Sequence, residues 1–174
     1  MALQIGQTAP SFDLEGVVGK EFKKVKLEDY KGKWVVLFFY PLDFTFVCPT
    51  EIQEFSKRHA EFEKLDAQVL GASVDSKFSH LAWINSELGE LNYPLLSDIT
   101  KQVSRAYDVL DEEGGVSFRG TFIIDPEGNL RYALKHDNSI GRSVEELLRS
   151  LQALQSGELC PAEWKPGGEF LKPA

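Results

Sequence analysis

The stretch Trp34-Val-Val-Leu-Phe-Phe-Tyr40 decides the fold of this chain, because it is a continuous apolar run bounded by turn formers. Gly32 precedes the run and Pro41 ends it. Aromatic and β-branched residues in a run of this length predict a strand that is buried on both faces. The same composition predicts two further strands, at residues 69–74 and 121–124.

A helical pattern follows each of the first two strands, and a third lies shortly before the C-terminal segment. Apolar residues recur at steps of three and four over residues 52–62, 81–88 and 144–154. On the first of these segments, charged residues occupy the opposite face, as in a helix that lies on a sheet. We expect Ser143 to cap the last helix, with Glu146 completing a capping box.

The third strand is followed by Asp125-Pro-Glu-Gly-Asn129, a strong turn signal that predicts a hairpin with residues 130–134. Strands that alternate with helices, with a closing hairpin, predict an α/β fold around a central mixed β-sheet flanked by helices. After Gly157 the periodicity stops, and the remaining segment holds three prolines and two glycines. We therefore expect one domain over residues 1–157 and an extended C-terminal arm over residues 158–174.

Composition narrows the class of protein. The chain has 174 residues, 43% of them hydrophobic and 26% charged, which suits a single globular domain. Its net charge of −8 argues against nucleic acid and anionic membranes as partners. No apolar stretch approaches the length of a membrane span, and no targeting segment is evident. The expected location is the cytoplasm.

The two cysteines are Cys48 and Cys160, which lie 112 positions apart and form no C-x-x-C motif. Since the three histidines are scattered, we expect no metal site, and nothing in the sequence indicates a cofactor. Isolated cysteines in a reducing compartment are most often inert buried residues. Cys48, however, follows a buried strand and opens a predicted helix, where unpaired N–H groups and the helix dipole favour a thiolate. Its position makes a reactive thiol as plausible as an inert one.

The loop around Cys48 resembles the active-site signature of the peroxiredoxins, P-x-x-x-T-x-x-C, which is met at Pro41, Thr45 and Cys48. Later segments resemble landmarks of the typical two-cysteine branch, which includes the catalytic component of bacterial alkyl hydroperoxide reductase. They are Phe118-Arg-Gly-Thr-Phe-Ile-Ile-Asp125, Gly141-Arg-Ser143 and Gly157-Glu-Leu-Cys-Pro-Ala-Glu-Trp-Lys-Pro166. The resemblance covers nearly the whole chain, and it implies a thioredoxin-like fold.

The resemblance also implies a reaction for each cysteine. Cys48 becomes the peroxidatic nucleophile, which attacks hydrogen peroxide or an organic hydroperoxide and is left as a sulfenic acid. Cys160 becomes the resolving thiol, which forms a disulfide with Cys48 of another subunit. Thioredoxin or a dedicated flavoprotein disulfide reductase then recycles the disulfide. A homodimer that assembles into a decameric ring is implied as well.

Five further residues receive roles from the resemblance. Thr45 is expected to hydrogen-bond the peroxide and the thiolate, and Pro41 to shield the thiolate from water. Arg119 is expected to supply fixed donors and positive charge to the sulfur and the peroxide. Glu51 and Arg142 are expected to orient Arg119.

Other conspicuous side chains receive structural interpretations. His59, Trp83 and Trp164 are expected to pack in the interior. Phe44 and Phe46, which belong to the loop before Cys48, are expected at an interface or over the pocket.

One segment departs from the family pattern. Peroxiredoxins that are sensitive to hydroperoxide carry a Gly-Gly-Leu-Gly loop and a C-terminal helix ending in Tyr-Phe. Here the loop reads Ser86-Glu-Leu-Gly89, and the chain stops at Phe170-Leu-Lys-Pro-Ala174. We therefore expect overoxidation of Cys48 to the sulfinic acid to be slow.

Two other functions remain open from the residues alone. The α/β pattern also permits a thioredoxin-like disulfide oxidoreductase, although the missing C-x-x-C argues against it. A non-enzymatic holdase or scaffold on the same fold is the other alternative. Peroxide consumption and insulin reduction assays separate the three.

Overall fold

Strand β3 (Trp34–Phe39) lies inside a seven-stranded mixed sheet with the order β2-β1-β5-β4-β3-β8-β9. It pairs in parallel with β4 (Ala67–Ser73) and antiparallel with β8 (Arg119–Ile124). The parallel pair requires a crossover, which the chain makes through α1 (Cys48–Lys57) and α2 (His59–Lys64). This crossover places Cys48 at the carboxyl end of β3.

The computed structural model describes residues 3–173. The other strands are β1 (Asp13–Val18), β2 (Glu21–Lys26), β5 (Leu95–Ser97), β6 (Leu110–Asp111), β7 (Val116–Ser117) and β9 (Leu130–His136). The other helices are η1 (Leu27–Tyr30), α3 (Lys77–Trp83), η2 (Ile84–Leu88), α4 (Gln102–Ala106) and α5 (Val144–Ser156). The chain divides into two compact units, residues 1–142 and 143–174, and the first contains the whole sheet.

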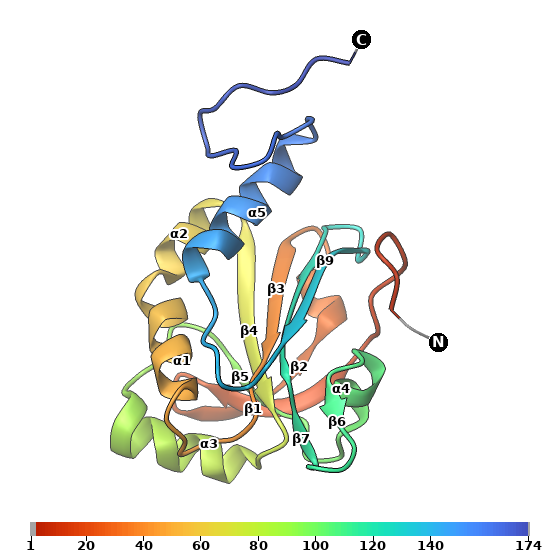
Figure 1. The fold of residues 1–174 in the computed structure, drawn as a ribbon. Coiled ribbons are helices and arrows are strands. Elements are labelled where there is room, and N and C mark those ends of the chain that lie inside the picture. The colour runs from red at the N-terminus through yellow and green to blue at the C-terminus, as the bar shows by residue number, and fades with distance from the viewer. Residues whose placement is uncertain (1–2, 174) are drawn as a thin grey trace. The chain divides into compact units, whose positions relative to one another are not determined.

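Within the first unit, helices cover both faces of the sheet, with α1 and α2 on one side and α4 on the other (Figure 1). Alternate residues of β3 supply the two cores. Phe38 stacks on Phe55 of α1, with ring centroids 4.3 Å apart, whereas Phe39 packs against Tyr107 on the other face at 5.5 Å. Gly71 makes room for the first stack, because a Cβ there would lie 2.7 Å from the Phe38 ring.

The sequence-based elements are largely confirmed. All three predicted strands are present, and β8 and β9 form the expected hairpin. The first predicted helix breaks at Arg58, where φ is −97° and ψ is 10°. The second changes from α to π geometry after Trp83. The sequence analysis did not identify the β1–β2 hairpin, whose second strand is mostly exposed and charged, or β5, which has only three residues.

In the second unit, α5 begins as predicted, with the Ser143 hydroxyl accepting from Glu146 N at 3.2 Å. The Glu146 carboxylate accepts from Arg149 and Ser150 rather than from the Ser143 backbone. The capping box is therefore only half formed. The helix ends at Ser156 and is capped by Gly157, whose φ of 67° suits glycine.

Residues 158–173 contain no helix, as expected, but they do not run straight. Leu159 and Leu171 form an antiparallel bridge, and the Trp164 and Phe170 rings stack with centroids 5.6 Å apart. Trp164 Nε1 also donates to the Gly168 carbonyl at 3.2 Å. The arm therefore folds back on itself.

Candidate active site

Cys48 is the first residue of α1 and follows the loop that leaves β3. Its side chain has no exposed surface. The residue before the helix, Val47, provides no side-chain cap, so the positive end of α1 faces the sulfur without a competing side-chain acceptor. Pro49 occupies the first turn, where its missing N–H leaves no hydrogen bond unmade.

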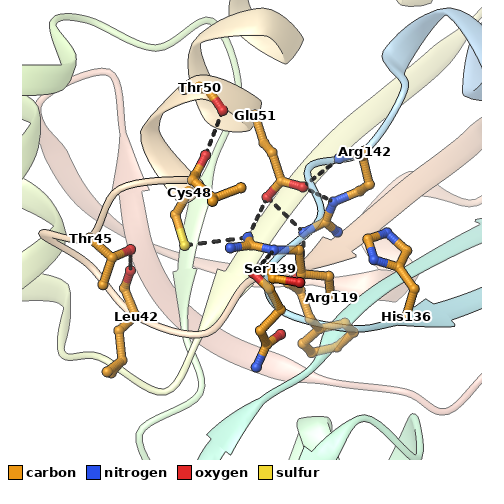
Figure 2. A network of polar contacts seen from close by, with 12 residues as sticks. Leu42, Thr45, Cys48, Thr50, Glu51, Arg119, His136, Ser139 and Arg142 are labelled. Atoms are coloured by element: carbon orange, nitrogen blue, oxygen red, sulfur yellow. Dashed lines mark hydrogen bonds and ion pairs between the residues drawn. The ribbon is translucent and has the colours of Figure 1, made fainter.

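Arg119, the first residue of β8, is the cation beside this sulfur. Its guanidinium is almost fully buried, and Nη1 donates to Cys48 Sγ at 3.4 Å (Figure 2). The same nitrogen donates to Glu51 Oε2 at 2.6 Å, and Nε donates to the Asn138 carbonyl at 2.9 Å. These bonds fix the guanidinium against the sulfur, and a fixed positive charge at this distance favours the thiolate over the thiol.

Glu51 joins two arginines within the same buried network. Its carboxylate accepts from Arg119 and, through Oε1, from the backbone N and Nε of Arg142, at 2.8 and 2.9 Å. Burial lowers the pKa of Arg142 from its ordinary value, while Glu51 acts in the opposite direction. The two guanidinium groups and the one carboxylate have a net charge of +1, which a Cys48 thiolate would neutralise.

Arg142 also holds the surrounding backbone. Nη2 donates to the Phe39 carbonyl at 2.6 Å, and Nη1 donates to the Gly120 carbonyl at 2.8 Å. The guanidinium lies over the Phe38 ring, 5.0 Å from its centroid. Through these contacts the end of β3, the start of β8 and the first turn of α1 share one rigid support.

Thr45 and Pro41 lie in the loop between β3 and Cys48. The Thr45 hydroxyl donates to the Leu42 carbonyl at 2.9 Å, so its single proton is already engaged. In the view of Figure 2, the Cys48 sulfur lies between Thr45 and Arg119. Pro41 is half-buried. The structure thus brings Glu51, Arg119 and Arg142 together around Cys48, and it places Thr45 in the same loop with its oxygen as an acceptor.

Cys160 belongs to the second unit, in the folded-back segment after α5. It is half-buried, and both cysteines are free thiols. Its sulfur lies 3.7 Å from Ser156 Oγ, and its S–H points toward the carbonyl oxygens of Glu158 and Ala153 at 3.8 and 4.0 Å. Among the residues that the structure describes, no cation donates a hydrogen bond to this sulfur, although Cys160 is a minor electrostatic partner of Arg149.

The sequence analysis missed a second polar cluster beside the site, formed by Tyr40, Asp43, Ser79 and His80. Asp43 lies in the loop before Cys48, but its partner His80 is 37 residues away. No local spacing links the two residues. The one available signal was a carboxylate placed between a buried strand and the reactive cysteine.

Residues 3–173 contain neither a candidate metal site nor a candidate membrane-spanning helix. No group of three or more His, Cys, Asp and Glu side chains there could hold a metal ion. Within the same range, no helix is both long and apolar enough to cross a membrane.

Comparisons with known proteins agree with this geometry. Residues 5–133 match the AhpC/TSA family. The chain is 56% identical to 2-Cys peroxiredoxin BAS1, chloroplastic, of Spinacia oleracea, with 97% of this chain and 68% of that protein covered. It is also 56% identical to Peroxiredoxin-2 of Bos taurus, with 97% and 89% covered.

Solved structures give the same result. The reduced 2-Cys peroxiredoxin of Plasmodium vivax superposes with a TM-score of 0.94 at 42% identity, covering 98% of this chain and 93% of that one. Mycobacterium bovis AhpC superposes with a TM-score of 0.86 at 42% identity, covering 95% and 99%. These likenesses confirm the thioredoxin-like fold. The chain belongs to the AhpC/TSA family, as a 2-Cys peroxiredoxin with thiol peroxidase activity.

Proposed function

We propose that the protein reduces hydrogen peroxide and organic hydroperoxides to water and alcohols, with Cys48 as the peroxidatic residue. The observation that carries the proposal is the Arg119 Nη1 to Cys48 Sγ bond of 3.4 Å in a buried network with one uncompensated positive charge. A thiolate is the reacting form of cysteine, and this network favours it. Burial keeps bulk water away from the sulfur.

In the first step, the Cys48 thiolate attacks one oxygen of the peroxide, and the O–O bond breaks. The sulfur becomes a sulfenic acid, while the leaving oxygen takes a proton and departs as water or alcohol. Arg119 Nη2 makes no hydrogen bond to any described residue, so its two N–H groups remain for the peroxide oxygens. Thr45 accepts a hydrogen bond from the protonated peroxide oxygen, Pro41 shields the thiolate from water, and Glu51 and Arg142 orient Arg119.

In the second step, the Cys160 thiol attacks the sulfenic sulfur, and the two sulfurs form a disulfide with loss of water. We assign this resolving role to the arm of residues 158–174 and place the bond between Cys48 of one subunit and Cys160 of another. The family relationship supports the assignment. Non-reducing gels of the oxidised protein test it, because an interchain bond gives dimer-sized bands and an intrachain bond gives monomer-sized bands.

The partners follow from the same chemistry. Thioredoxin or a dedicated flavoprotein disulfide reductase returns the disulfide to two thiols. The subunits form homodimers that assemble into decameric rings, and the half-exposed Phe44 and fully exposed Phe46 offer apolar surface for such an interface. We propose the cytoplasm as the location, since its reducing conditions suit a cycle that starts from two thiols.

The decisive experiment is reconstitution of peroxide reduction coupled to NAD(P)H, with each reductase system in turn. We expect the wild-type protein to consume hydrogen peroxide and Cys48→Ser to consume none. Insulin reduction by the same preparation should stay at background, because that assay reports a disulfide oxidoreductase. Peroxide consumption that survives in Cys48→Ser would contradict the assignment of the peroxidatic residue.

A further inference from the structure

The reaction leaves unused a buried polar cluster on the loop that precedes Cys48. At its centre is Asp43, whose carboxylate accepts from the Tyr40 hydroxyl at 2.7 Å and from Ser79 Oγ at 2.8 Å. His80 Nδ1 lies 2.7 Å from the same carboxylate. The side chains of Asp43 and His80 have 1% and 0% of their surface exposed. A polar cluster that is buried to this extent is expected to have a structural or functional role.

The His80 ring forms a hydrogen bond at each of its nitrogens. Nε2 lies 2.9 Å from the Leu96 carbonyl, which can only accept a hydrogen bond. Nδ1 faces a carboxylate that already accepts from two hydroxyl groups. The Asp43 carboxyl group is therefore the common partner of three side chains, and its bond to His80 is short and fully buried. Burial raises the pKa of Tyr40 well above its ordinary value, and the Asp43 charge acts in the same direction, so Tyr40 stays a donor.

This pair connects the Cys48 loop to the rigid part of the sheet. His80 belongs to α3, and the carbonyl that it binds belongs to β5. The backbone N of Asp43 also donates to Asp75 Oδ2 at 2.9 Å, just beyond the end of β4. The loop is therefore anchored at Asp43 by side chains from two separate elements.

Next to this anchor the loop is strained. Phe44 has a φ of 56°, in the left-handed region that a bulky residue rarely adopts. The Thr45 hydroxyl bonds within the loop itself, to Leu42, and so adds no connection to the sheet. Strain of this kind persists only where surrounding contacts impose it. The hydrogen bonds of Asp43 provide such contacts, together with packing of the Phe44 ring against Trp83, whose centroid lies 5.6 Å away.

Opening of this loop matters because Cys48 has no exposed surface. The two sulfurs of a disulfide lie about 2.0 Å apart, so the turn around Cys48 must open before a second cysteine can bond to it. The peroxide step has the opposite requirement, since Arg119 reaches the sulfur in the closed arrangement. A sulfenic acid that stays closed is exposed to a second peroxide, which transfers an oxygen to give sulfinic acid and leaves as water or alcohol.

We propose that Asp43 and His80 are positioning residues that latch the loop of residues 40–47, and that the strength of this latch sets the partition of the Cys48 sulfenic acid between disulfide and sulfinic acid. The proposal rests on the proposed function, because it concerns the fate of that intermediate. A strong latch favours the sulfinic acid, and a weak latch favours the disulfide. The latch acts through the position of Cys48 and touches neither the sulfur nor the substrate.

The test compares His80→Gln with His59→Gln, which makes the same change at a second buried histidine with no bond to the loop. Reduced protein is treated with increasing excesses of hydrogen peroxide, and intact mass gives the ratio of sulfinic acid to disulfide. We expect the ratio to fall about tenfold or more in His80→Gln, the effect of losing a charge-assisted bond. The peroxide step should slow as well, while His59→Gln should match the wild type in both.

Ser79→Ala provides a milder variant that removes one donor to Asp43 and keeps the Asp43–His80 hydrogen bond. We expect its ratio to fall about two- to tenfold, the effect of one hydrogen bond. It carries the test alone if His80→Gln does not fold. Wild-type ratios in both variants, with a wild-type protein that forms its disulfide normally, would overturn the latch alone. A wild-type protein that formed neither sulfenic acid nor disulfide would instead overturn the proposed function.

Discussion

Cys48 and Cys160 carry the same side chain in opposite surroundings. The sulfur of Cys48 is buried at the start of a helix and accepts a hydrogen bond from the Arg119 guanidinium. The sulfur of Cys160 is half-buried in a non-helical segment, and its S–H faces two carbonyl oxygens. A donor that is a cation favours the thiolate, whereas carbonyl acceptors favour the protonated thiol. We expect this difference in charge placement, more than the cysteines themselves, to decide which sulfur meets the peroxide.

The largest expected effect follows from removing the reactive sulfur. Cys48→Ser should abolish peroxide turnover, because a serine hydroxyl has essentially no anion at neutral pH and no reducible oxidised form. Stopped-flow peroxide consumption measures the loss. The matched control is Cys160→Ser, which keeps the first step. Turnover at the wild-type rate in Cys48→Ser would mean that Cys160 is the nucleophile. The reactivities of the two cysteines would then be the reverse of those proposed.

Removing the other sulfur should end the cycle after one turn. Cys160→Ser should consume about one equivalent of peroxide per subunit and then stall, because the sulfenic acid has no resolving thiol. Quantification of peroxide against protein in the absence of other thiols gives the stoichiometry. Sustained cycling of this variant with the physiological reductant would show that the resolving thiol lies elsewhere.

Arg119→Ala should slow oxidation of Cys48 by about 30- to 1000-fold, which corresponds to roughly 2–4 kcal/mol of lost transition-state stabilisation. The midpoint of the pH profile for Cys48 alkylation should also move to higher pH, since a neighbouring cation has gone. Arg131→Ala is the control, because that half-exposed arginine on β9 pairs with Asp125 away from the sulfur. A pH profile that stays in place would remove Arg119 as the electrostatic partner of Cys48.

Glu51→Gln tests the carboxylate that holds Arg119 beside Cys48, and we expect a smaller effect on the rate of Cys48 oxidation. The substitution keeps the shape of the side chain but leaves two buried guanidinium groups without their shared carboxylate. The free energy of unfolding in urea should fall by about 3–5 kcal/mol. Oxidation per folded molecule should slow less than in Arg119→Ala. Glu54→Gln, on the exposed side of the same helix, should leave both quantities unchanged, and equal stability losses in the two variants would count against the network.

Hydrophobic patterns in the sequence predicted the helices and strands well where buried residues follow one another regularly. The apolar run of β3 and the repeat over α5 are local patterns, and both elements form as expected. The short β5 was missed because it has no internal pattern and pairs with a strand that is distant in the sequence. Strand β2 forms a local hairpin with β1, but it was missed because it is mostly charged and exposed. The break at Arg58 likewise divides one continuous apolar face into two helices.

Local sequence patterns predicted the candidate active site less well than the fold. The roles of Arg119 and Glu51 came from a family resemblance, because they are separated by 68 residues and no spacing rule joins them. The Asp43–His80 pair had neither a motif nor a local period, and it was missed although both side chains are buried in the fold. Buried ion pairs depend on topology, so they become visible only once the strands have been placed.

The most direct test of the central claim compares the two sulfurs in single-cysteine proteins. Cys160→Ser and Cys48→Ser are each treated with less than one equivalent of hydrogen peroxide in the presence of dimedone, which traps sulfenic acid, and mass spectrometry follows the adduct over time. The account predicts rapid labelling of Cys48 in the first protein and slow labelling of Cys160 in the second. Equal labelling rates for the two sulfurs would contradict it, because the Arg119 network would then confer no special reactivity on Cys48.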